Sequence, residues 1–144
     1  MIWTCVAECF AKVFNVSFEE LIELLGHDGS EIIWPQQKDP MCRRGFHVQE
    51  MVRVGLKLGF AVVQVESHPS VYPDPEEKPF YLPEVPLHRF FDLAPGVVTG
   101  YDTLRGCRHA LAIVGGRVFD PAGTISRYGD FEAENLFLVF KTKA

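Results

Sequence analysis

Residues 106–121 constrain the fold of this chain more than any other stretch, because two short apolar segments there flank a Gly115-Gly116 pair. Such a pair is a strong local signal for a β-hairpin, since glycine tolerates the positive φ that the turn needs. His109 opens the first predicted strand and Asp120 closes the second. With the turn at the two glycines, residues whose numbers sum to about 230 lie opposite each other. The imidazole and the carboxylate are therefore predicted to lie close together.

A histidine oriented by a carboxylate is a base, and the chain also offers a nucleophile. Cys5 lies near the start of a helix that the apolar spacing predicts over residues 4–14, with Thr4 as a possible N-cap. A helix N-terminus and a nearby imidazolium both lower the pKa of a thiol. The residues therefore support a Cys5–His109–Asp120 triad, in which the backbone N–H of Cys5 is one donor to an oxyanion.

The composition favours one domain over residues 1–144 and argues against several classes of protein. Hydrophobic residues make up 47% of the chain and charged residues 23%, as in ordinary globular domains. A net charge of −5 without clustered Lys and Arg argues against nucleic-acid binding. No apolar run approaches the roughly 18 residues of a membrane span, and no signal peptide is visible. We expect a cytoplasmic protein with reduced cysteines and no cofactor or metal; the sequence does not set its oligomeric state.

The apolar pattern predicts three helices in the N-terminal part of the chain. The first covers residues 4–14. The second begins at the capping box Ser17-Phe18-Glu19-Glu20 and ends at Gly26. The third runs from residue 46 or 47 to residue 58. Residues 27–45, between the second and third helices, are predicted to be a loop.

The C-terminal part of the chain is predicted to form strands. Residues 67–86 hold six of the ten prolines, too many for regular structure, and are interpreted as an ordered excursion or a lid. The order of elements predicts an α+β fold, with a helical half over about residues 1–59 packed on an antiparallel sheet over about residues 60–144. Besides the hairpin, the expected strands are residues 60–66, 96–101 and 136–141.

Four short segments share their order and spacing with a known family. A cysteine starts the first helix, Ser-x-x-Glu opens the second, His109-Ala110 precedes an apolar run, and Asp120-Pro121 follows eleven residues past His109. In this the chain resembles the papain-like cysteine peptidases, and most closely the bacteriocin-processing, double-glycine-leader branch and its free-standing relatives. The segments are residues 5–11, 15–20, 109–114 and 118–121.

The resemblance implies a papain-like fold and a bacterial thiol protease. It implies Cys5 as the nucleophile, His109 as the general base and acid, and Asp120 as the orienting residue. The reaction would be hydrolysis of a peptide or amide bond through a Cys acyl-enzyme, with a peptide or protein as substrate. The family usually carries a Gln a few residues before the Cys, whose amide completes the oxyanion hole, and residues 1–4 contain none. Candidates for a second donor are Thr4, Gln36, Gln37 and Gln49.

Other readings of the same residues stay open. Cys5 could be a small buried core residue, and Cys9, one turn further along the helix, is predicted to belong to the core. Cys5, Cys9, Cys107 and His109 could in principle form a zinc site, although their spacings do not match the usual motifs. The four cysteines could also form two disulfides.

Two functional alternatives use the same fold. A catalytically inactive papain-like module would bind a peptide or protein partner in its cleft. An acyl transferase would use the same triad, with an amine or a thiol in place of water as the acceptor. The remaining histidines lie in or beside predicted loops and are expected to be solvated: His27, His47, His68 and His88.

Overall fold

The computed structural model describes residues 3–65, 94–102, 106–122 and 131–142. Two predicted features, the proline-rich stretch 67–86 and residue 66 of the first strand, lie outside these residues.

The three helices form where the apolar pattern predicts them. They are α1 (Cys5–Phe14), α2 (Phe18–Leu25) and α3 (Val48–Leu58). The Ser17 hydroxyl accepts the backbone N–H of Glu20 at 3.1 Å and so caps α2. Each helix ends at a residue in the left-handed region, as helix C-termini commonly do. Those residues are Asn15, Gly26 and Gly59, with φ of 56°, 83° and 88°.

The strands form one antiparallel sheet in the order β1-β5-β2-β3-β4. The last strand was expected from residue 136 but begins five residues earlier, because Phe131 and Ala133 pair with β2. The strands are β1 (Phe60–Val65), β2 (Gly96–Asp102), β3 (Cys107–Val114), β4 (Arg117–Phe119) and β5 (Phe131–Lys141).

The predicted hairpin joins β3 to β4. Gly115 and Gly116 have φ of 59° and 75°, a backbone conformation that side-chain-bearing residues rarely adopt. Val114 lies opposite Arg117, so opposed residue numbers sum to 231, one more than expected. Pairing with β4 stops at Ala112, and among the described residues no other strand pairs with the first residues of β3 on that side.

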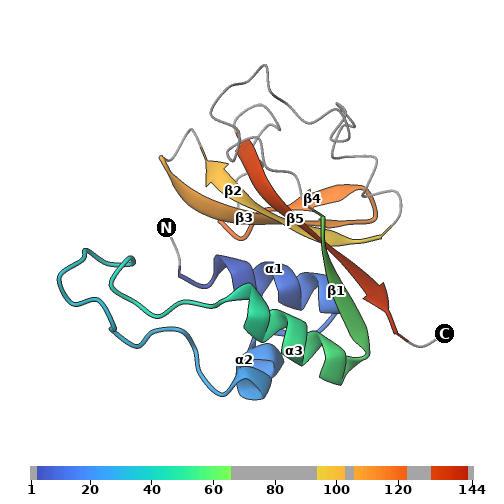
Figure 1. Cartoon of the computed structure of the whole chain (residues 1–144), viewed down its shortest axis with the longest axis horizontal. Coiled ribbons are helices and arrows are strands. Elements are labelled where there is room, and N and C mark those ends of the chain that lie inside the picture. The colour runs from blue at the N-terminus through green and yellow to red at the C-terminus, as the bar shows by residue number, and fades with distance from the viewer. Residues whose placement is uncertain (1–2, 66–93, 103–105, 123–130, 143–144) are drawn as a thin grey trace.

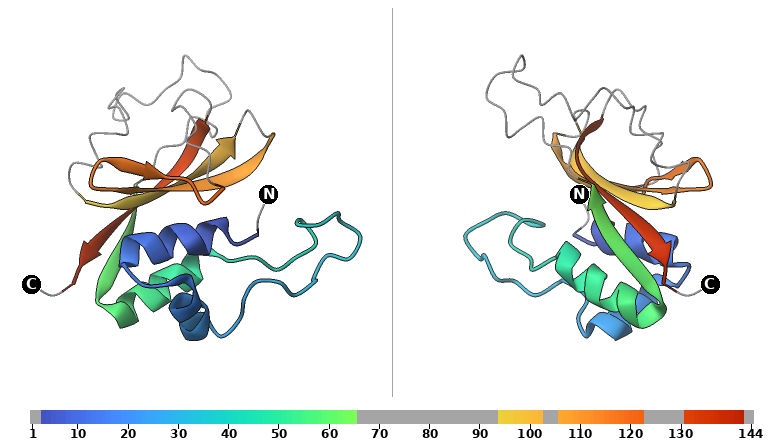
Figure 2. Two further views of the ribbon diagram at one scale, coloured as in Figure 1. Left: turned by 180° about the vertical axis from the view of Figure 1, so that it is seen from behind. Right: turned by 45° about the vertical axis from the view of Figure 1, so that its right-hand side comes forward.

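The helices lie together on one face of the sheet, and α1 packs under β3 (Figures 1 and 2). Phe10 is fully buried between the two layers, with its ring centroid 5.6 Å from Phe14 and 6.2 Å from Phe137 of β5. Ala110 and Ala112 of β3 face this core, and their small side chains let α1 approach the strand closely. The observed architecture of the described residues is therefore α+β, with three helices and a five-stranded antiparallel sheet.

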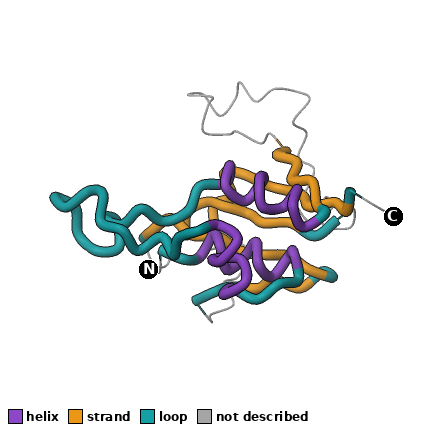
Figure 3. Tube along the Cα trace, turned by 90° about the horizontal axis from the view of Figure 1, so that it is seen from below, coloured by secondary structure: helices purple, strands orange, loops and turns teal. Residues whose placement is uncertain are grey.

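A long loop, residues 27–47, connects α2 to α3 and extends beyond the helices (Figure 3). It folds back on itself through an isolated bridge between Ile32 and Arg43. The backbone N–H groups of Ile33 and Arg44 donate to the carbonyls of Cys42 and Glu31 at 2.9 and 2.7 Å. The loop is thus held by its own hydrogen bonds.

Among the described residues, no helix is long and apolar enough to cross a membrane.

Candidate active site

His109 and Asp120 form a buried pair at the open end of the hairpin. The distance from His109 Nε2 to Asp120 Oδ1 is 2.6 Å, and their side chains are 4% and 1% exposed. The same carboxylate oxygen accepts the backbone N–H of Ala122 at 2.9 Å. The turn at the two glycines therefore brings these side chains together, as the sequence predicts.

The bond to Asp120 fixes the role of each nitrogen of the His109 ring. A carboxylate oxygen only accepts, so Nε2 carries the proton and donates it to Asp120. In the neutral ring the other nitrogen, Nδ1, then holds a lone pair. Within the part of the chain that the structure describes, Nδ1 forms no hydrogen bond. His109 is therefore set up to accept a proton at Nδ1.

Cys5 is the first residue of α1, where backbone N–H groups have no partner inside the helix. Thr4 occupies the N-cap position, but its hydroxyl donates to Glu8 Oε2 at 3.3 Å and does not cap the helix. The predicted N-cap position of Thr4 is therefore confirmed, but its side chain forms no capping hydrogen bond. The N–H groups at this helix start stay available to a thiolate or an oxyanion.

Cys5 and His109, from opposite layers of the fold, line one hollow of about 470 Å³. The structure thus brings together the two residues that the sequence separates by more than a hundred positions. Among the described residues, no hydrogen bond joins the Cys5 thiol to the His109 imidazole. The two groups share a space but are not an ion pair.

Burial raises the pKa of the Cys5 thiol, against the downward pull of the backbone N–H groups of Ala110 and Val6. From its position at the helix N-terminus, the sequence predicts a lowered pKa for Cys5. The pKa is raised instead, because desolvation of the thiolate outweighs the backbone N–H groups. Burial also raises the pKa of Cys9 well above its usual value, with smaller contributions from Cys5, Glu8 and Asp120. Cys9 is fully buried in the core, as expected.

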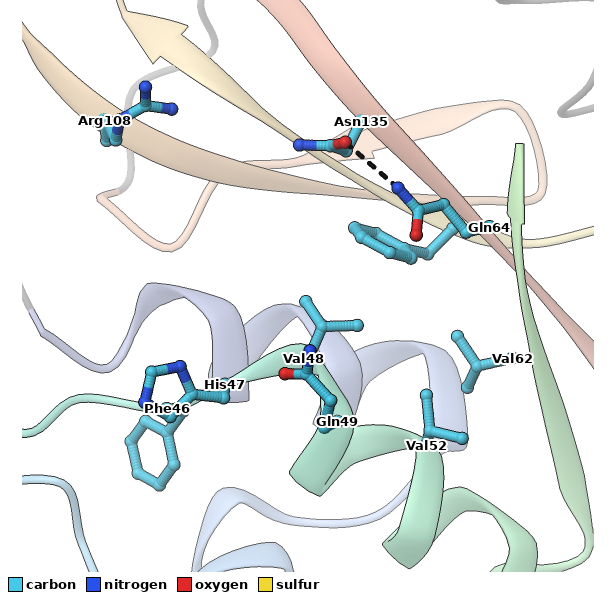
Figure 4. Close-up of a pocket in the computed structure, with 10 residues that line it drawn as sticks. Phe46, His47, Val48, Gln49, Val52, Val62, Gln64, Arg108 and Asn135 are labelled. Carbon is cyan, nitrogen blue, oxygen red and sulfur yellow. Dashed lines mark hydrogen bonds between the residues drawn. The ribbon is translucent and has the colours of Figure 1, made fainter. Parts of the chain in front are cut away.

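A second hollow, of about 640 Å³, adjoins the first between α3 and the sheet (Figure 4). Phe46, His47 and Arg108 line both hollows. In the second one, Gln64 Nε2 donates to Asn135 Oδ1 at 3.2 Å across β1 and β5. Its apolar lining comes from α3, β1 and β5: Val48, Val52, Val62 and Phe137.

The candidates for a second oxyanion donor do not reach the thiol. Gln36 and Gln37 are exposed in the loop, and Gln49 lines the second hollow. The Thr4 hydroxyl is bound to Glu8. The backbone N–H groups of Ala110 and Val6, which act on the Cys5 thiol, are candidates to stabilise an oxyanion.

Sequence reasoning missed the part that residues 27–47 play in the site. This loop supplies half of the first hollow, including Met41, Arg43 and Phe46. The expectation that His27 is solvated is also wrong. Its Nε2 lies 2.7 Å from Glu50 Oε1, its Nδ1 accepts the Gly29 N–H at 3.0 Å, and its side chain is 15% exposed. A loop dense in charged residues of both signs was the available signal, but it does not specify their partners.

All four cysteines are free, so neither of the two considered disulfides is formed. Among the described residues, no group of three or more His, Cys, Asp or Glu side chains is arranged to hold a metal ion. Comparison of the sequence with family models and with curated proteins gives no match. The groups that the described site offers for chemistry are the Cys5 thiol, the oriented His109 imidazole and the backbone N–H groups around the thiol.

Proposed function

We propose that this chain is a papain-like thiol hydrolase that cleaves a peptide bond through an acyl-enzyme on Cys5. One observation carries the proposal: Cys5 at the start of α1 and His109, oriented by Asp120, line the same hollow. A helical layer that bears the cysteine, packed on an antiparallel sheet that bears the histidine, also agrees with the sequence resemblance. This pairing of nucleophile and oriented base is what covalent catalysis needs.

The raised pKa of Cys5 favours general-base activation over a preformed thiolate–imidazolium pair. His109 Nδ1 takes the thiol proton as sulfur attacks the carbonyl carbon of the scissile bond. Asp120 stabilises the imidazolium, and the Cys5 N–H donates to the oxyanion of the tetrahedral intermediate. Collapse breaks the C–N bond while the imidazolium protonates the leaving amine. Water then attacks the acyl-enzyme, with His109 again taking the proton, and releases the acid and the free thiol.

The adjoining hollows favour a peptide over a small amide as substrate. Together they extend from the thiol to the space between α3 and the sheet. The neutral amides of Gln64 and Asn135 match the donors and acceptors of a peptide backbone, and the valines beside them match an apolar side chain. A small amide would leave most of this surface unused.

A non-catalytic module that binds a peptide in the same cleft is the second candidate. The observation in its favour is that the Cys5 thiol is partly buried, has a raised pKa and, among the described residues, is not hydrogen-bonded to His109. A thiol of raised pKa without a base in contact is a weak nucleophile. The two candidates predict opposite outcomes when the protein is incubated with peptides.

The test uses a mixed library of peptides from a digested proteome, with new termini identified by mass spectrometry. The parent protein, Cys5→Ala and His109→Ala are compared, with Cys107→Ala as the matched control because Cys107 is also a partly buried cysteine but lines neither hollow. We expect cleavage by the parent and the control and none by the other two. Peptides retained by all four proteins without any new termini would support the binding module instead.

A further inference from the structure

The start of α1 lacks the side-chain cap that usually fixes a helix end, since the Thr4 hydroxyl bonds to Glu8. Cys5 packs against the core, and the segment that enters the helix before it is held by other contacts. The residue before Thr4 is Trp3, and both the edge and the face of its indole contact the loop of residues 27–47. Trp3 Nε1 donates to the carbonyl of Asp28 at 3.2 Å, and the Arg43 guanidinium lies 4.4 Å from the centre of the ring.

Arg43 is itself held by the loop on every side of its guanidinium. Its Nε and Nη2 donate to the two carboxylate oxygens of Asp39 at 2.8 and 3.0 Å, and Nη1 donates to the carbonyl of Ser30 at 2.9 Å. The planar fork of arginine suits this arrangement, because one flat group can bond in its plane and stack on an indole. A lysine could keep the charge but not the fork or the stack.

We propose that Arg43 is a positioning residue for the Cys5 nucleophile and acts through Trp3. The inference rests on the proposed function. Trp3, Arg43 and Cys5 line the same hollow, so the contact lies beside the reacting atoms. By fixing Trp3, Arg43 sets the direction in which the chain enters α1. The entry direction determines how the Cys5 thiol and its backbone N–H face His109 across the hollow.

The test is the rate of alkylation of Cys5 by iodoacetamide, with the modified residue located by mass spectrometry. The thiolate displaces iodide and His109 takes the thiol proton, so the rate near pH 7 reports on the Cys5–His109 geometry. On the alkaline plateau of the parent's pH profile, where the Cys5 thiol is already ionised, the reaction no longer needs proton transfer to His109. We expect Arg43→Ala and Trp3→Ala each to slow the neutral reaction roughly tenfold and to change the alkaline reaction by no more than about twofold.

Three further variants separate positioning from other roles. Arg43→Lys should slow the alkylation of Cys5 near pH 7 as much as Arg43→Ala does. A parent-like rate in Arg43→Lys would show that the charge alone matters. The double variant of Trp3 and Arg43 should be no slower than the slower single variant, because the two residues act in series. Arg53→Ala, which removes an exposed arginine of α3 outside both hollows, should match the parent.

Thermal unfolding of each variant checks that the protein is folded. If Arg43→Ala does not fold, Asp39→Asn replaces it, because this change weakens the paired hydrogen bonds between Arg43 and the Asp39 carboxylate. A merely structural role would lower the melting temperature and leave the neutral rate unchanged. The inference is overturned if the neutral rate stays within about twofold of the parent, if lysine rescues it, or if the two single effects multiply. Loss of His109 dependence in the parent would instead remove the proposed function.

Discussion

The two halves of the candidate site are held in opposite ways. His109 and Asp120 lie eleven residues apart on one hairpin, and their side chains are almost fully buried. Cys5 lies on the helical layer. The segment before it contacts the loop of residues 27–47 through Trp3, which stacks on Arg43. Arg43 in turn pairs with Asp39, whose side chain is 57% exposed. Local sequence and burial determine the His109–Asp120 pair, whereas residues distant in sequence contact the segment that precedes Cys5.

This difference predicts where substitutions abolish function and where they adjust it. Removing one partner of a buried hydrogen-bonded pair costs about 1–3 kcal/mol, because the remaining partner stays buried without compensation. Exposed ion pairs contribute about 0–1 kcal/mol each. Changes on the hairpin should therefore remove both activity and stability, while changes in residues 27–47 should alter the geometry of Cys5 in a protein that still folds.

Removing the carboxylate should give the largest effect on activity. In Asp120→Ala the His109 Nε2–H and the Ala122 N–H both lose their acceptor. We expect Cys5-dependent peptide cleavage to fall at least roughly a hundredfold and the free energy of unfolding to fall by about 1–3 kcal/mol. Cleavage assays and urea denaturation measure the two changes.

Asp120→Asn is the matched control, because its amide oxygen still accepts both hydrogen bonds while the charge is lost. It should recover most of the stability and part of the activity. An Asp120→Ala protein as stable and as active as the parent would show that the buried pair does not orient His109.

The contact between the two halves should give the largest effect on stability. Phe10 lies between the helical layer and the sheet, so Phe10→Ala leaves a cavity where they meet. We expect a loss of about 3–5 kcal/mol in the free energy of unfolding, measured by urea denaturation. Phe140→Ala, which truncates a 39% exposed phenylalanine of β5, is the control and should cost far less. Equal losses at both positions would mean that Phe10 does not join the layers.

A smaller and pH-dependent effect is expected from Glu50 at the base of the loop. Burial pushes its pKa upward, but the His47 backbone N–H and the His27 imidazole lower it below its usual value overall. A carboxylate with a lowered pKa stabilises the fold above its unfolded pKa of about 4.3, and this contribution disappears as the pH falls through the folded value. Glu50→Gln should therefore cost about 1 kcal/mol at neutral pH and less in acid.

Urea denaturation at neutral and acid pH measures this difference, with the exposed Glu23→Gln of α2 as the control. The same loss for Glu50→Gln at both pH values would rule out the charged form as the stabilising species.

Local patterns were sufficient to predict the elements and the contact between His109 and Asp120. The 3.6-residue periodicity and the end signals at Ser17 and Gly26 correctly gave the helices. The Gly115-Gly116 turn gave a hairpin whose geometry alone brings His109 to Asp120. In each case the interacting residues are close in sequence, so the local sequence pattern is enough to predict their contact.

Long-range features could not be predicted in the same way. The raised pKa of Cys5 comes from burial by the sheet, which the sequence around residue 5 does not contain. The contacts of Trp3 with Asp28 and Arg43, and of His27 with Glu50, join residues more than twenty positions apart. Residues 27–47 show no periodicity that would specify these partners, because a loop held by side-chain hydrogen bonds has no repeating geometry.

The most direct test of the central claim is the pH dependence of Cys5 alkylation in the parent and in His109→Ala. If His109 is the general base, the parent should react at least roughly tenfold faster near pH 7, and the two rates should converge as the pH rises through the raised pKa of the Cys5 thiol. His109→Ala should then show only the titration of a buried thiol with a raised pKa. Identical profiles for the two proteins would contradict the account, because Cys5 would then react without help from His109.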